Sequence, residues 1–269
     1  MPLDVPVDLR VPPLLLRLPV RTLLLLGGAL ALAIGANRLG VIDDGVVRVV
    51  GVAAGHGGLL AVALASADAR WHRPAAFVIA LLVLAAGFAR TGAPGALAYL
   101  VVPAALVWLA SRQSSFADLG IVAPPSGRGL LLGLAAGLFL GGHLLLSASR
   151  TFGYQVGLAA PAQYLTALAY DVGANVPSAE CFFRGTLFNS AQRRWTFAPA
   201  VALATGAAVV RYLVDPALPG AIEVAAGAVF YVSLLSVTSC ALFWWSGSLL
   251  PGAVAGLVFF AAYRALGGW

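Results

Sequence analysis

The sequence contains very little charge. Only 10% of its 269 residues are Asp, Glu, Lys or Arg, and 61% are hydrophobic. An average soluble domain has about 25% charged and about 45–50% apolar residues, so this composition excludes the soluble, disordered and collagen-like classes. Lysine is absent, and all 16 basic residues are Arg. No segment concentrates the net charge of +6 into a basic patch that would bind nucleic acid, so we expect no nucleic-acid partner.

Cysteine and histidine are also scarce. Cys181 and Cys240 both lie in apolar segments, which predicts free, packed thiols rather than a disulfide. The three histidines are far apart: His56 between two glycines, His72 near a span end and His143 within a span. Packing between helices is the leading interpretation of His56. There is no HExxH, CxxC, P-loop or GxSxG pattern, so we expect neither a metal nor another cofactor.

The chain instead contains long apolar runs separated by Gly, Pro and Arg. A helix needs about 20 apolar residues to cross the hydrocarbon core of a bilayer. We therefore predict an all-α fold, a polytopic transmembrane bundle of eight to nine spans in a lipid bilayer. The expected spans cover residues 22–36, 46–67, 75–89, 95–110, 129–147, 177–191, 197–214, 221–245 and 248–266. Residues 151–176 are less apolar and predict a loop followed by an interfacial helix.

The polar segment 111–128 is the expected boundary between two units. Residues 1–115 would form a four-span N-terminal module, and residues 116–269 a transmembrane core. Counting arginines with the N-terminus inside gives nine on the inner side and six on the outer side. The positive-inside rule then favours a cytoplasmic N-terminus. We expect an integral protein of a bacterial-type plasma membrane.

Ionisable residues inside a bilayer are costly and mark functional sites by default. Glu180 lies inside an expected span, and Arg184 follows it by four residues, which places both side chains on one helix face. The simplest interpretation is an ion pair that stabilises the helix arrangement. Asp171 and Glu223 are expected either to pair with Arg211 or to lie at interfaces.

The segment around this pair resembles the first signature of the CPBP family, the CaaX-protease and bacteriocin-processing (Abi) membrane proteins. The family pattern is a Pro, a short gap, two adjacent glutamates, three residues and Arg-Gly. Two weaker similarities flank it, FADLGIVAPPSGRGLLLGLAAGLFLG upstream and GSLLPGAVAG downstream, so that the resemblance covers about residues 116–269. The matching positions in PSAECFFRGTL are Pro177, Glu180, Phe183, Arg184, Gly185 and Leu187.

The resemblance implies an intramembrane endopeptidase, but most of the family's catalytic positions are substituted here. In active members the first glutamate and a histidine of the next helix activate water, and a second histidine and an Asn or His one turn later complete the site. Glu180 and Arg184 remain and resemble the supporting pair rather than the water activator. The other positions align with Ala179, Arg211, Gly256 and Phe260.

Three functions are therefore open. The first is a degenerate, non-proteolytic CPBP-like protein that binds a membrane-embedded or lipidated peptide, or a partner protein. The second is an active protease in which Glu180 is the base and His143 its displaced partner, which requires the two side chains to lie within hydrogen-bond reach. The third is a transporter or channel with a fortuitous resemblance, although the sequence shows no internal repeat.

Overall fold

The computed structural model describes residues 17–67, 71–112, 120, 126–157, 160–213 and 222–266. These residues are almost entirely helical and form no strand, apart from an isolated bridge between Val156 and Leu266. The predicted all-α fold is confirmed. The helices before the expected boundary are α1 (Val20–Arg38), α2 (Asp44–Val52), η3 (Ala53–Gly57), α3 (Gly58–Ala67), α4 (His72–Ala89), α5 (Ala93–Ala96), η5 (Leu97–Leu100) and α6 (Val101–Arg112). Those after it are α7 (Gly127–Phe152), α8 (Pro161–Tyr170), η7 (Asp171–Asn175), α9 (Val176–Ala179), η8 (Glu180–Phe188), α10 (Asn189–Gln192), α11 (Phe197–Leu213), α12 (Ile222–Ser246) and α13 (Leu250–Tyr263).

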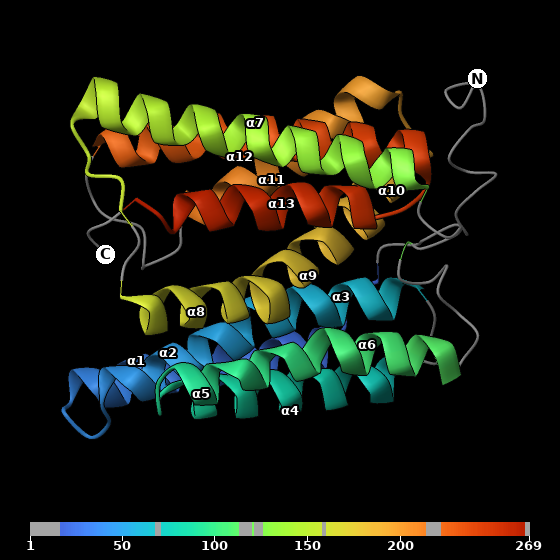
Figure 1. Cartoon of the computed structure of the whole chain (residues 1–269). Helices are drawn as coiled ribbons and strands as arrows, with labels where there is room; N and C mark the ends of the chain where they lie inside the picture. The colour runs from blue at the N-terminus through green and yellow to red at the C-terminus, as the bar shows by residue number, and fades with distance from the viewer. Residues whose placement is uncertain are drawn as a thin grey trace.

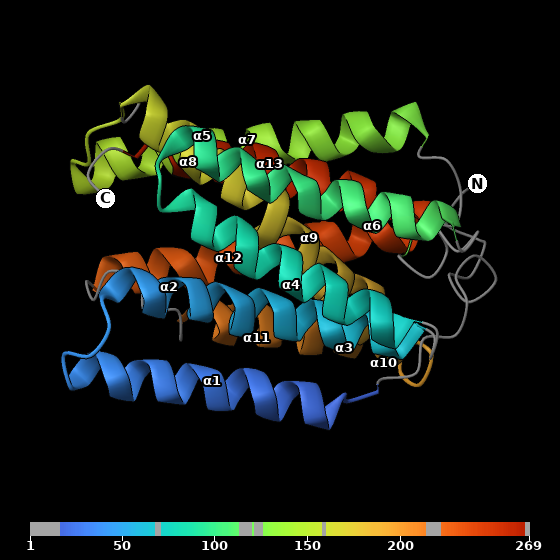
Figure 2. The same cartoon turned by 90° about the horizontal axis from the view of Figure 1, so that it is seen from below.

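The helices form two layers that lie on either side of one long helix. Figure 1 shows α1 to α6 in one layer, α7 and α11 to α13 in the other, with α8 beside the first layer and α9 rising obliquely from it toward the second. Figure 2 shows the same helices from below, with α1 at the margin of the bundle. The segments α8 to α10 follow one another without interruption, so we call residues 161–192 the central helix. It contacts α3, η5 and α6 in one layer and α11 and α13 in the other.

The central helix differs from the expected loop and interfacial helix over residues 151–176. A helix starts at Pro161, whose lack of an N–H is harmless in the first turn, and passes straight through Asp171 and Asn175. The polarity of this segment suggested a chain outside the apolar core. The structure instead satisfies these side chains with partners from other helices, so they stay buried within the protein.

Several helix ends follow local sequence signals. The Asp43 carboxylate caps α2 by accepting a hydrogen bond from the N–H of Val46, and it also pairs with Arg90. That N–H and the guanidinium hold the pKa of Asp43 below its usual value. Ser126 caps α7 in the same way, and Gly153 ends α7 in the left-handed conformation with φ of 69°.

Helix α7 packs closely against α13. Glycines recur every four residues on α7 and face α13, at positions 129, 133, 137 and 141. A methyl group at Gly133 would overlap the carbonyl oxygen of Pro251, and one at Gly137 would lie 2.7 Å from the oxygen of Ala255. The two backbones therefore touch, as small residues allow in membrane helix pairs. The GLAAG segment therefore packs closely on α13, whereas the two glycines of GAVAG face Glu180 and Ser239 or Val176.

Five helices of the described residues are long and apolar enough to cross a membrane: Val20–Arg38, Asp44–Ala67, Ala93–Arg112, Gly127–Phe152 and Val224–Ser246. Three shorter apolar helices accompany them, Arg73–Ala89, Phe197–Leu213 and Leu250–Tyr263. Large apolar side chains point outward from both layers, among them Leu24 and Leu32 of α1 and Phe139 of α7. This outer surface is compatible with an integral membrane protein.

Candidate functional site

The central helix contains two π-helical segments, η7 and η8, and each carries a polar pair spaced by four residues. The pairs are Asp171 with Asn175 and Glu180 with Arg184, and all four side chains are buried. π-Helical turns are rare and are often found at functional sites, because the wider turn displaces side chains from the regular helical positions. The buried charges Asp171, Glu180 and Arg184 thus lie in irregular turns of the helix between the two layers.

The structure confirms the expected contact between Glu180 and Arg184. Arg184 Nη1 lies 3.5 Å from Glu180 Oε1, and the two residues are only 3% and 5% exposed. A charge-assisted hydrogen bond is usually about 2.7–2.9 Å long, so this ion pair is loose. Glu180 Oε2 and Arg184 Nε make no direct hydrogen bond to any described residue.

Small residues of α12 and α13 surround the pair. Cys240 lies against Arg184, and Ser239 lies beside Glu180. A methyl group at Gly252 would lie 2.7 Å from Glu180 Oε2 and 3.2 Å from Ser239 Oγ. Because Gly252 has no side chain, it leaves the space that the Glu180 carboxylate occupies. Both cysteines are free thiols, as predicted.

Next to the pair is a cavity of about 20 Å³. Apart from Glu180, Arg184 and the hydroxyl of Tyr212, its walls are apolar. The lining residues are Val176, Ala179, Glu180, Phe183, Arg184, Ala208, Tyr212, Val232, Leu235, Gly256 and Phe260. A water molecule needs about 10–15 Å³ of such volume, so the cavity has room for one water and not for a peptide.

Most of the positions that the CPBP resemblance aligns with catalytic residues line this cavity. Ala179, Gly256 and Phe260 all line it together with the Glu180–Arg184 pair. Arg211 is different: it is absent from the lining, and the next residue, Tyr212, forms part of the wall instead. On α11 it is therefore Tyr212, and not the aligned Arg211, that faces the cavity.

His143 does not join this site. It is exposed on α7, where its Nδ1 lies 2.8 Å from the Tyr231 hydroxyl and 3.3 Å from Ser147 Oγ. Among the described residues that line the Glu180 cavity, His143 is not found. The sequence hypothesis that His143 assists Glu180 requires a contact that this arrangement does not make.

His56, which was expected to pack between helices, is the centre of a buried hydrogen-bond network. Its Nε2 lies 2.6 Å from the Tyr170 hydroxyl and 3.1 Å from Arg211 Nη2, and its Nδ1 lies 2.7 Å from Ser178 Oγ. Because arginine can only donate, Nε2 must accept, so the ring is neutral and donates from Nδ1 to Ser178. His56 thereby ties η3 of the first layer to the central helix and to α11.

A second network lies one turn away on the central helix. Arg264 binds Asp171 through two hydrogen bonds of 3.0 and 3.1 Å, and Asn175 Nδ2 donates to the same carboxylate. The Tyr212 hydroxyl then donates to Asn175 Oδ1. Asp171 was expected to pair with Arg211 or to lie at an interface; it pairs with Arg264, since the α13 C-terminus reaches η7. The side chain of Glu223 lies outside the described residues, as does that of His72.

The sequence analysis singled out Asp171 but missed Asn175, Ser178 and the serines of α12, although spacing signals were present. Asp171, Asn175 and Ser178 are separated by four and three residues, the spacing of one helix face. Ser236 and Ser239 repeat the three-residue step on α12, beginning at Ser233. One weakly polar residue in an apolar run predicts little by itself. Several such residues on one helix face predict a polar contact on that face.

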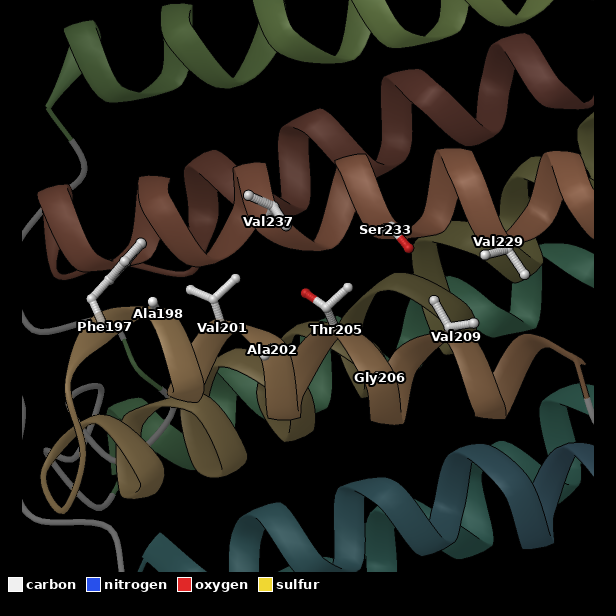
Figure 3. A pocket seen from close by; sticks show the side chains of 10 residues that line it. All are labelled: Phe197, Ala198, Val201, Ala202, Thr205, Gly206, Val209, Val229, Ser233 and Val237. Carbon is white, nitrogen blue, oxygen red and sulfur yellow. The ribbon is translucent and has the colours of Figure 1, made fainter.

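Outside the buried site, an open groove of about 590 Å³ runs between α11 and α12. Figure 3 shows its side chains, mostly small or β-branched, with the hydroxyls of Thr205 and Ser233 among them. Thr205 donates to the buried Ser236 at 3.2 Å, so a hydroxyl pair connects the groove to the interior of the bundle. The lining residues are Phe197, Ala198, Val201, Ala202, Thr205, Gly206, Val209, Val229, Ser233 and Val237.

The site therefore combines a loose buried ion pair, a one-water cavity and two hydrogen-bond networks, all centred on residues 161–192. It brings together Glu180 and Arg184, as expected, and leaves His143 outside. No described cluster of three or more His, Cys, Asp or Glu side chains could hold a metal ion. No family model, no curated protein and no solved structure matches the chain.

Proposed function

We propose that the chain is an integral membrane protein, a non-proteolytic relative of the CPBP endopeptidases that binds a membrane-embedded or lipidated peptide. We place it in a bacterial-type plasma membrane with its N-terminus in the cytoplasm. The observation that carries the proposal is the Glu180 cavity. Three positions that the resemblance aligns with catalytic residues converge there, and they are Ala179, Gly256 and Phe260.

Water-mediated peptide hydrolysis needs a base, a positioned water and stabilisation of the oxyanion, all within reach of a scissile bond. Glu180 is the one carboxylate that lines the described cavity, and Arg184 opposes its charge. A cavity of about 20 Å³ cannot admit a peptide bond. These features support a protein that keeps the Glu180–Arg184 ion pair but does not hydrolyse peptides.

The groove between α11 and α12 offers the space that the cavity lacks. Its volume of about 590 Å³ falls within the range of about 300–1,000 Å³ typical of ligand pockets. Small residues recur on α11 at Ala198, Ala202 and Gly206, which lets a neighbouring helix or chain approach closely. An apolar peptide with a few polar groups to meet Thr205 and Ser233 suits this lining.

Cleavage and binding assays on the purified chain in liposomes test the proposal. Fluorescent membrane-spanning and prenylated peptides should remain intact with the wild type and with Glu180→Gln alike. Cleavage by the wild type that Glu180→Gln abolishes would establish the protease alternative instead.

For binding, Gly206→Leu should weaken peptide affinity at least tenfold, because the new side chain would occupy the groove. Gly142→Leu on α7 is the matched control. At both glycines, the position that a Cβ would take has no atom of another element within 4 Å, so each can accept a larger residue. Equal affinities for the two variants would remove the groove from the proposal.

A further inference from the structure

The polar atoms around Glu180 are incompletely paired. Within the described structure, Glu180 Oε2 and Arg184 Nε make no direct hydrogen bond of ordinary geometry, although Ser239 lies beside the Glu180 carboxylate, and the two residues are 5% and 3% exposed. A buried polar group without a partner costs about 1–3 kcal/mol, and more if it is charged. Native proteins usually satisfy such groups with an ordered water.

The neighbouring cavity has the size and the lining for that role. Its volume of about 20 Å³ accommodates one water molecule and no larger ligand. Glu180 supplies an acceptor, and Arg184 supplies donors. The distance of 3.5 Å between Arg184 Nη1 and Glu180 Oε1 is at the limit of a direct contact, so both groups keep hydrogen-bonding capacity that a water can use.

We propose that this cavity is a specific binding site for one water molecule, which bridges Glu180 and Arg184 and completes the ion pair. The water donates to the Glu180 carboxylate and accepts from the Arg184 guanidinium. The inference is independent of peptide binding in the groove, since it concerns a different volume and different side chains.

Two aromatic rings form the wall that retains this water. Tyr212 and Phe260 stack with ring centroids 5.9 Å apart and an angle of 21° between their planes, and both line the cavity. The Tyr212 hydroxyl is held by Asn175, and the Arg211 guanidinium lies 4.5 Å from the centre of the Tyr212 ring. The wall is therefore fixed from two sides, so the bound water should exchange slowly with bulk solvent.

Selective isotope labelling gives a direct test, because the chain contains two glutamates, Glu180 and Glu223. The intact protein is labelled with ¹³C-glutamate, reconstituted in lipid bilayers and measured by solid-state NMR. Glu180→Gln identifies the Glu180 carboxyl signal by its loss. We expect polarisation transfer from water protons to the Glu180 carboxyl carbon. A Glu180 signal without such transfer overturns the proposal.

Variants that fill the cavity test whether the water is located there. A methyl group at Gly256 would lie 3.6 Å from Val176, an ordinary contact, so Gly256→Ala should fold and displace the water. Ala208→Val fills the same cavity from α11 and serves if the first variant is unstable. Each should abolish the transfer to Glu180, whereas Gly142→Ala, on an open face of α7, should preserve it. Transfer that persists in both filled variants would refute a water in this cavity.

Discussion

The bidentate pair between Asp171 and Arg264 predicts an asymmetric response to mutation. Asp171 is 0% exposed, whereas the Arg264 side chain is 26% exposed. Arg264→Leu leaves a fully buried carboxylate with Asn175 as its remaining partner, which should destabilise the protein by about 3–5 kcal/mol. Asp171→Asn removes the charge, and Arg264 can then turn toward solvent. This variant should lose about 1–3 kcal/mol.

The double variant Asp171→Asn/Arg264→Leu separates this explanation from a simple loss of packing. Because no buried charge remains in it, the double variant should be more stable than Arg264→Leu alone. Unfolding of the purified protein in mixed micelles, followed by tryptophan fluorescence against the fraction of denaturing detergent, measures the three free energies. Arg150→Leu, at an exposed site in the last turn of α7, is the control and should change the stability by about 0.5 kcal/mol at most. Additive losses in the double variant, or a loss below about 1 kcal/mol for Arg264→Leu, would refute the reasoning.

Three further predictions follow from the packing and the networks. Gly133→Ala should lower the stability by about 1–3 kcal/mol, because its methyl group would overlap the backbone of α13, while Gly142→Ala should not; the same micelle titration compares them. His56→Phe should loosen the contact between the layers and speed hydrogen exchange of the central helix, whereas unchanged exchange would show that the network is unimportant. The N–H of Val46 and the Arg90 guanidinium lower the pKa of Asp43. Its carboxylate therefore stabilises the fold above about pH 4, and this contribution is lost as the pH falls below that value. The stability difference between Asp43→Asn and wild type should accordingly shrink in acid.

The helical fold was predictable because its signal is distributed over many residues. Long apolar runs with Gly, Pro and Arg between them specify helices whatever their partners are, and the i,i+4 rule was enough to bring Glu180 to Arg184. The four-residue spacing of glycines on α7 is likewise typical of a close helix contact, which the α7–α13 pair makes.

The polar networks were not predictable from local pattern, because they depend on contacts between distant helices. Asp171 could have paired with several arginines, and the choice of Arg264 follows from where α13 ends. His56 lies between glycines, which is typical of a packing residue. Its hydrogen-bond partners Ser178 and Arg211 are distant in the sequence, so the local pattern does not reveal them. The π-helical turns at residues 171–175 and 180–188 have no clear sequence signature, so the exact positions of the side chains that they displace could not be predicted.

The partners of His56 also set an order of events during synthesis. Tyr170 and Ser178 follow it by 114 and 122 residues. At about 5–20 residues per second, the ribosome needs about 6 to 24 seconds to produce them. During that interval α1 to α6 can already insert into a bilayer, but the imidazole has none of its final hydrogen-bond partners. An unpaired imidazole inside a bilayer is costly, so in the proposed membrane-spanning arrangement we expect this side chain to stay hydrated until the central helix is made.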